Sequence, residues 1–155
     1  MRHRTGKKTI DDIEWEMYLV ELENWEEEFT CPVQPGIAVV FVHGHQKSVP
    51  LKILSTFLGN LIRLVPSVVL FFGLDAEYWH DVYDELLVEK MLAESEDHAD
   101  CSTIYERTRD IGEILDQLSS VYLPSNEDYI DTHDVLFLMH KDSGVSVHLE
   151  KWMRS

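Results

Sequence analysis

A short polar string after residue 41 contains groups that could bind a ligand. It consists of Val42, His43, Gly44, His45, Gln46, Lys47 and Ser48. We expect it to join the C-terminal end of a central strand to the start of a helix, which is where open α/β sheets bind ligands. The string is not a P-loop, because that motif requires glycine immediately before the Lys-Ser pair and Gln46 stands there.

The same string offers two metal ligands. His43 and His45 are spaced by one residue, and Asp75, at the end of the next predicted strand, would add a carboxylate. Two imidazoles and a carboxylate suit zinc or a similar ion. Histidines in a loop more often bond locally or face solvent, and no further ligand is identifiable, so we expect no metal, no cofactor and no catalytic residue.

The elements that would position this string follow from the apolar pattern. Residues 12–23 alternate apolar and polar side chains, which is typical of a half-buried strand. Residues 37–42 and 67–72 are apolar on both faces, as central strands are. A buried helix that starts at Ser48 and ends at Pro66 lies between them, so these two strands should be parallel neighbours in a right-handed βαβ unit.

The second half of the chain predicts two more helices and two more strands. One helix begins at Asp75, and another begins at a capping box, Thr103 to Glu106, and ends before Pro124. Residues 134–140 and 145–152 flank a short turn that contains a glycine, so we expect a C-terminal β-hairpin.

Together these elements predict an α/β or α+β fold in a single domain. It would hold a mixed sheet of about five strands with a central βαβ unit, three helices and a C-terminal hairpin. We expect residues 1–10 to form a disordered basic tail and residues 11–155 to form the globular domain. The first residues do not have the pattern of a signal peptide and Pro66 interrupts the most apolar stretch, so we expect a cytoplasmic protein with no membrane contact.

The charge balance restricts the function. The chain has 155 residues with 13 basic and 29 acidic side chains, a net charge of −16, which works against binding nucleic acid. The acids are also segregated, because residues 11–28 carry nine acids and no base while residues 29–74 carry no acid. The apolar middle of the chain therefore forms the core, and the flanking segments form an acidic surface.

Two acidic segments are the candidate partner-binding residues. The 126–134 segment places an aromatic side chain among carboxylates, and such an anchor ringed by charge is typical of a protein interface. The acids on the outer face of the helix after Asp75 form the second segment. The predicted residues are Glu127, Asp128, Tyr129, Asp131, Asp134, Asp81, Asp84 and Glu85.

The resulting expectation is an acidic protein that binds and inhibits a basic partner, of the type of an immunity protein, an antitoxin or a phage anti-defence protein. The partner would be an enzyme that acts on nucleic acid, because carboxylates placed where phosphates bind block such a site. The alternative is a small enzyme or a nucleotide- or metal-binding domain centred on His43, His45, Lys47 and Asp75. An acidic secretion-type chaperone is a third interpretation, and a homodimer stays open.

Overall fold

The central strands are buried on both faces, and this explains the layered architecture of the computed structural model, which describes residues 1–43, 49–94 and 101–155. The sheet has six strands in the order β1-β2-β6-β3-β4-β5. All neighbours run parallel except β1 and β2. The strands are β1 (Arg2–Ile10), β2 (Ile13–Leu22), β3 (Ile37–Phe41), β4 (Val68–Phe72), β5 (Ser102–Glu106) and β6 (Asp134–His140).

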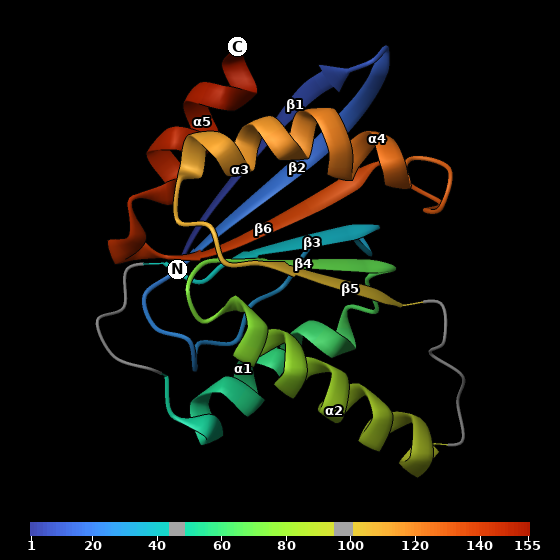
Figure 1. Cartoon of the computed structure of the whole chain (residues 1–155), viewed down its shortest axis with the longest axis vertical. Coiled ribbons are helices and arrows are strands. Elements are labelled where there is room, and N and C mark those ends of the chain that lie inside the picture. The colour runs from blue at the N-terminus through green and yellow to red at the C-terminus, as the bar shows by residue number, and fades with distance from the viewer. Residues whose placement is uncertain (44–48, 95–100) are drawn as a thin grey trace.

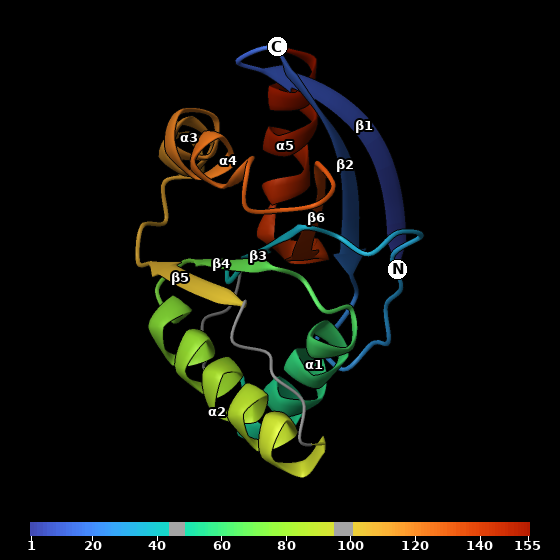
Figure 2. The same cartoon turned by 90° about the vertical axis from the view of Figure 1, so that its right-hand side faces the viewer.

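Helices cover both faces of this sheet (Figures 1 and 2). They are α1 (Leu51–Arg63), α2 (Ala76–Glu94), α3 (Ile111–Gln117), a π-helical turn (Leu118–Tyr122), α4 (Leu123–Asn126), a 3-10 turn (Lys141–Ser143) and α5 (Val145–Arg154). α1 and α2 lie on one face, and α3, α4 and α5 lie on the other. The chain is therefore one α/β domain with a mixed sheet, as its pattern predicts.

β3 and β4 divide their side chains between two cores. Ala38 and Val40 of β3 pack with α1 and α2, whereas Val39 and Phe41 pack with α3 and α5. Alternate residues of a strand point to opposite faces, so a strand in the middle of such a sheet must be apolar throughout. The predicted parallel pairing of these strands is confirmed, with Val40 opposite Phe71.

The N-terminal residues form a strand, so the predicted disordered tail at 1–10 is wrong. β1 pairs with the acidic strand β2, and Lys7 Nζ lies 3.2 Å from Glu16 and 3.6 Å from Glu14. Asp11 and Asp12 both have positive φ values, as the two central residues of a type I′ hairpin turn do. Pairing of a basic strand with an acidic one orders a segment that composition alone makes look disordered.

The last predicted strand is a helix, so the C-terminal hairpin is also wrong. Val145 and Leu149 are buried while Val147 is 69% exposed, which is a helical spacing. The valines and the leucine at 145, 147 and 149 also fit the alternation of a strand, and this ambiguity misled the prediction. Gly144, with a φ of 73°, supplies the left-handed turn before α5.

The capping box predicted at 103–106 lies in β5 and starts no helix. The helix begins at Ile111, where the Asp110 carboxylate accepts a hydrogen bond from the Glu113 amide at 3.2 Å. The helical path also passes Pro124, which occupies the first turn of α4, where proline needs no amide donor. The sheet thus has six strands instead of about five, and the described chain has five α-helices instead of three.

None of the described helices is both long and apolar enough to cross a membrane.

Val40 tests the two-sided burial of the central strands. Replacing Val40, which is fully buried, with Asp should unfold the domain, because an unpaired buried carboxylate costs several kcal/mol of a total stability of about 5–15 kcal/mol. The matched control, Val147→Asp on the exposed face of α5, should change stability by less than about 0.5 kcal/mol. Thermal unfolding followed by circular dichroism measures both variants, and a folded Val40→Asp protein would contradict the strand assignment.

Lys8 tests the attachment of β1. Its Nζ donates to the Trp152 carbonyl at 2.8 Å and lies 5.0 Å from the Trp152 ring, so it binds the C-terminal end of α5. Lys8→Met should cost about 1 kcal/mol and speed amide exchange along β1. Lys7→Met, which changes the opposite face of the same strand, should have a smaller effect. Equal effects of both variants would show that the contact with α5 does not hold β1.

Candidate partner-binding surface

α2 presents one apolar side to the core and one acidic side outward. Trp79, Val82 and Tyr83 are buried against α1 and the sheet. Asp81 and Glu85 are exposed on the other side of the same turns. This helical alternation keeps the carboxylates in water while the aromatic side chains hold the helix in place.

Asp84, the third predicted residue of α2, has a different role. It is half-buried, and its Oδ1 accepts a hydrogen bond from Thr103 Oγ1 of β5 at 2.8 Å. His80 Nε2 lies 3.4 Å from the other Asp84 oxygen, and His80 Nδ1 lies 3.0 Å from Asp81. Asp84 therefore attaches α2 to the edge strand β5, and its carboxylate is less available to a partner than that of Glu85.

The segment between α4 and β6 is anchored by an apolar side chain. Ile130 is buried, and its Cβ would lie 3.1 Å from a Cβ added at Gly36, so the two segments are in close contact. His133 packs on the Trp15 ring at 4.9 Å and its Nε2 lies 3.2 Å from the Glu127 carbonyl. This segment is thus held firmly against the α3 and α5 side of the sheet.

The five predicted residues of this segment divide by exposure. Asp128, Tyr129 and Asp131 are exposed, and the Tyr129 side chain retains 48% of its accessible surface. Glu127 and Asp134 are half-buried. Burial raises the pKa of the Tyr18 hydroxyl, and the negative charge of nearby Asp134 adds to that effect. The Asp134 carboxylate therefore lies near Tyr18 of β2.

The two predicted patches lie on opposite sides of the sheet (Figure 2). α2 belongs to the layer with α1, whereas the 127–134 segment follows α4 in the other layer. A compact interface therefore uses one patch, and a partner that covers both has to reach around an edge of the sheet.

Ion pairing leaves the negative charge on these patches uncompensated. Within the described parts of the chain, six basic side chains form ion pairs with the protein's own carboxylates: Arg2, Arg4, Lys7, Arg63, Arg107 and Arg154. Over those same parts, Glu85, Glu89, Asp128 and Asp131 have no such pair. These four exposed carboxylates therefore keep their negative charge available to a partner.

Sequence reasoning missed an exposed apolar group on α2. Val88 is 53% exposed and Leu92 is 78% exposed, one helical turn apart and beside Glu85 and Glu89. The signal was present, because the adjacent residues Leu86, Leu87 and Val88 cannot all face the core from one helix. An apolar anchor beside acids thus occurs on α2 as well as at Tyr129.

The alternative site at the strand ends is only partly described. His43 follows β3, is half-buried, and lies 6.0 Å from the Phe41 ring. Burial lowers the pKa of His43, which favours a neutral imidazole. Asp75 precedes α2, and its carbonyl accepts from the Trp79 amide at 3.1 Å. His45 and Lys47 lie outside the described residues.

No group of three or more His, Cys, Asp or Glu side chains in residues 1–43, 49–94 and 101–155 is arranged to hold a metal ion.

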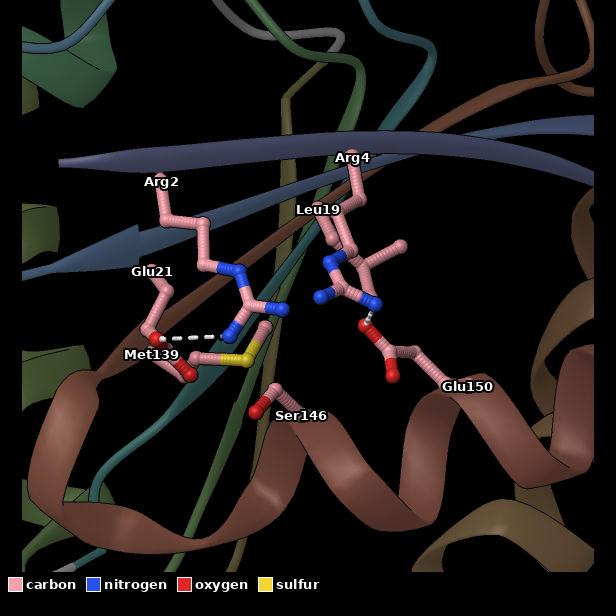
Figure 3. Close-up of a pocket in the computed structure, with 7 residues that line it drawn as sticks. All are labelled: Arg2, Arg4, Leu19, Glu21, Met139, Ser146 and Glu150. Carbon is pink, nitrogen blue, oxygen red and sulfur yellow. Dashed lines mark ion pairs between the residues drawn. The ribbon is translucent and has the colours of Figure 1, made fainter.

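A small pocket between β1 and α5 has a structural role (Figure 3). Leu19 and Met139 are among its lining residues, and Arg4 forms an ion pair with Glu150 of α5. Arg2 reaches Glu21 of β2 at 4.0 Å. Because each arginine already has a carboxylate partner, the pocket joins β1 to its neighbours and offers no free cation to an anionic ligand.

Comparison with known proteins adds no functional assignment, because no protein-family model matches this chain and no curated protein matches it either.

Elemental analysis tests whether the strand-end residues His43, His45 and Asp75 bind a metal ion. Protein purified without an affinity tag should contain no stoichiometric zinc, manganese or iron, because the sequence offers no further ligand beside His43, His45 and Asp75. The same measurement on His45→Ala is the control. Stoichiometric metal that this substitution removes would favour the enzyme or nucleotide-binding alternative.

Proposed function

We propose that this protein is an inhibitor that binds a basic enzyme acting on nucleic acid, in the manner of an immunity protein, an antitoxin or a phage anti-defence protein. The observation that supports this most is the set of exposed carboxylates on α2 and the 127–134 segment that lack an ion pair in the described chain. Such charge speeds the association with a basic surface.

The chemistry of the target follows from the same charge. A site that holds a phosphate backbone is lined with lysine and arginine, and a rigid surface of carboxylates can occupy it in place of the phosphates. The backbone around Tyr129 is fixed by Ile130 and by a hydrogen bond from the Tyr129 amide to the Asn126 carbonyl at 3.0 Å. A preorganised acidic surface loses little entropy when it binds, which supports tight inhibition.

The compartment is part of the same proposal. Cys31 and Cys101 are both free thiols, and burial raises the pKa of each, which keeps them protonated and unreactive. Free, unreactive cysteines suit a reducing compartment, so we place the protein in the cytoplasm with its target.

Capture from a lysate of the source organism at low and at high salt tests the proposal, followed by an activity assay of the captured protein. We expect a basic protein that elutes as salt rises and whose nucleic-acid activity falls when the inhibitor is added back in equal amount. Capture of a nucleotide or metal ion in place of a protein would favour the strand-end alternative. Capture of an unfolded secreted client along an apolar surface would favour a chaperone.

Kinetic measurements on variants of the 127–134 segment give a sharper prediction. Replacing Asp128 and Asp131 together with Lys should slow association and flatten its dependence on salt, because the charges steer the encounter. Tyr129→Ala should mainly speed dissociation, by about 30-fold if the ring contributes about 2 kcal/mol as an anchor. Surface plasmon resonance with the identified partner measures both rates.

The matched control reverses the same number of charges elsewhere, at Asp116 of α3 and Asp142 of the 3-10 turn, and should leave both rates nearly unchanged. Equal effects of the control and of the Asp128 and Asp131 variant would show that only total charge matters. If neither variant of the 127–134 segment changes a rate, the interface lies elsewhere.

A further inference from the structure

The outward side of α2 carries a regular stripe of exposed side chains. We define the α2 stripe by its five members, all of them exposed: Tyr78, Asp81, Glu85, Val88 and Leu92. Successive members are three, four, three and four residues apart. This spacing places them on one side of the helix and is the repeat along which two helices pack.

The stripe lies on a helix that is held in place from behind. Trp79 and Tyr83 are at most 1% exposed, and the Trp79 ring packs edge-on against Trp25 at 4.8 Å. The hydrogen bond between Thr103 and Asp84 attaches the helix to β5. α2 is therefore a fixed platform whose free side faces away from the sheet (Figure 2).

The chemistry along the stripe changes from apolar to acidic and back. Tyr78 is 41% exposed at one end, and Val88 and Leu92 are 53% and 78% exposed at the other. Asp81 and Glu85 lie between these ends. Over the whole of α2, six carboxylates stand against a single lysine, Lys90. A binding partner that complements the stripe needs apolar groups at both ends and positive charge in the middle.

We propose that the α2 stripe docks an amphipathic helix of the basic partner, with lysine or arginine opposite Asp81 and Glu85 and apolar side chains against Tyr78, Val88 and Leu92. A helix fits because its side chains repeat at the same spacing, so one face meets all five positions. This inference rests on the proposed function and identifies the part of the partner that would be recognised.

A second copy of this chain is a poor occupant of the same surface. If two α2 helices packed antiparallel about Glu85, each Glu85 would face the other Glu85, and the remaining acids would lie close by. Like charges at such positions destabilise helix pairing. The acidic middle of the stripe thus selects against self-association and in favour of a cationic partner.

A defined peptide tests this inference without the native partner. The probe is a synthetic helix with apolar residues at its heptad a and d positions, except for two central lysines placed to meet Asp81 and Glu85. Titration into isotope-labelled full-length protein should shift the amide signals of α2 between residues 78 and 92. Fluorescence anisotropy of the labelled peptide gives the affinity.

Two sets of variants separate the apolar and the charged contributions. Val88→Ser with Leu92→Ser should weaken binding about tenfold or more, while Val147→Ser, at an exposed valine of α5, should leave it unchanged. Asp81→Lys with Glu85→Lys should abolish binding of the lysine peptide. The same variant should instead bind a peptide in which glutamates replace the two lysines, and this exchange of specificity excludes misfolding as the cause.

Three outcomes would overturn the inference, and they differ from failure of the proposed function. Shifts confined to residues 127–134 would place the docking site on the other acidic patch. Sedimentation that shows a dimer lost in Leu92→Ser would make a second copy the occupant. No binding of the peptide, together with capture of the native partner, would exclude the helix as the recognised element. If the peptide binds at α2 but no basic enzyme is inhibited, the docking surface on α2 is supported and only the proposed inhibitor function is rejected.

Discussion

The whole architecture depends on one constraint at its centre: both faces of β3 and β4 are buried, so neither strand can carry a polar side chain. All five residues of each strand are buried, and alternate side chains enter two separate cores. Helices must therefore cover both faces of the sheet, and the carboxylates must lie on the outer sides of those helices and in the connections. This division explains why acids gather on the outer side of α2 and in the 127–134 segment. The two apolar cores cannot hold carboxylates, so the acidic side chains occupy exposed positions.

The distribution of positive charge adds to this effect. The basic strand β1 lies beside the acidic strand β2, and Arg4 forms an ion pair with Glu150 while Lys8 binds the end of α5. These contacts order the N-terminal residues and keep the positive charges of Arg4 and Lys8 at β1 and α5, on the other side of the sheet from α2. An edge strand rich in charged side chains also resists pairing with other chains. The outward side of α2, with six carboxylates and one lysine along the helix, stays predominantly negative.

The sequence allowed the central βαβ unit to be predicted because its burial is two-sided and its helix is clearly bounded. The errors arose where one sequence pattern is compatible with two structures.

Val145, Val147 and Leu149 fit the spacing of both a strand and a helix, and only the packing of Val145 and Leu149 against the sheet decides between the two. β1 has little apolar content, so its order comes from backbone pairing with β2 and from ion pairs and hydrogen bonds, some of them with distant residues of α5, which an apolar pattern does not reveal. For the candidate surface, the residue types were predictable, but their division between two sides of the sheet, the use of Asp84 to bind Thr103, and the exposure of Leu92 depend on the tertiary structure.

The central claim is that uncompensated surface carboxylates drive binding to a basic enzyme. The most direct test is the association rate constant of the wild-type protein with its captured partner, measured by stopped-flow over a series of salt concentrations. The account predicts an association rate that falls steeply as salt rises while the dissociation rate changes little, because salt screens the long-range attraction before contact. An association rate that does not depend on salt would contradict it.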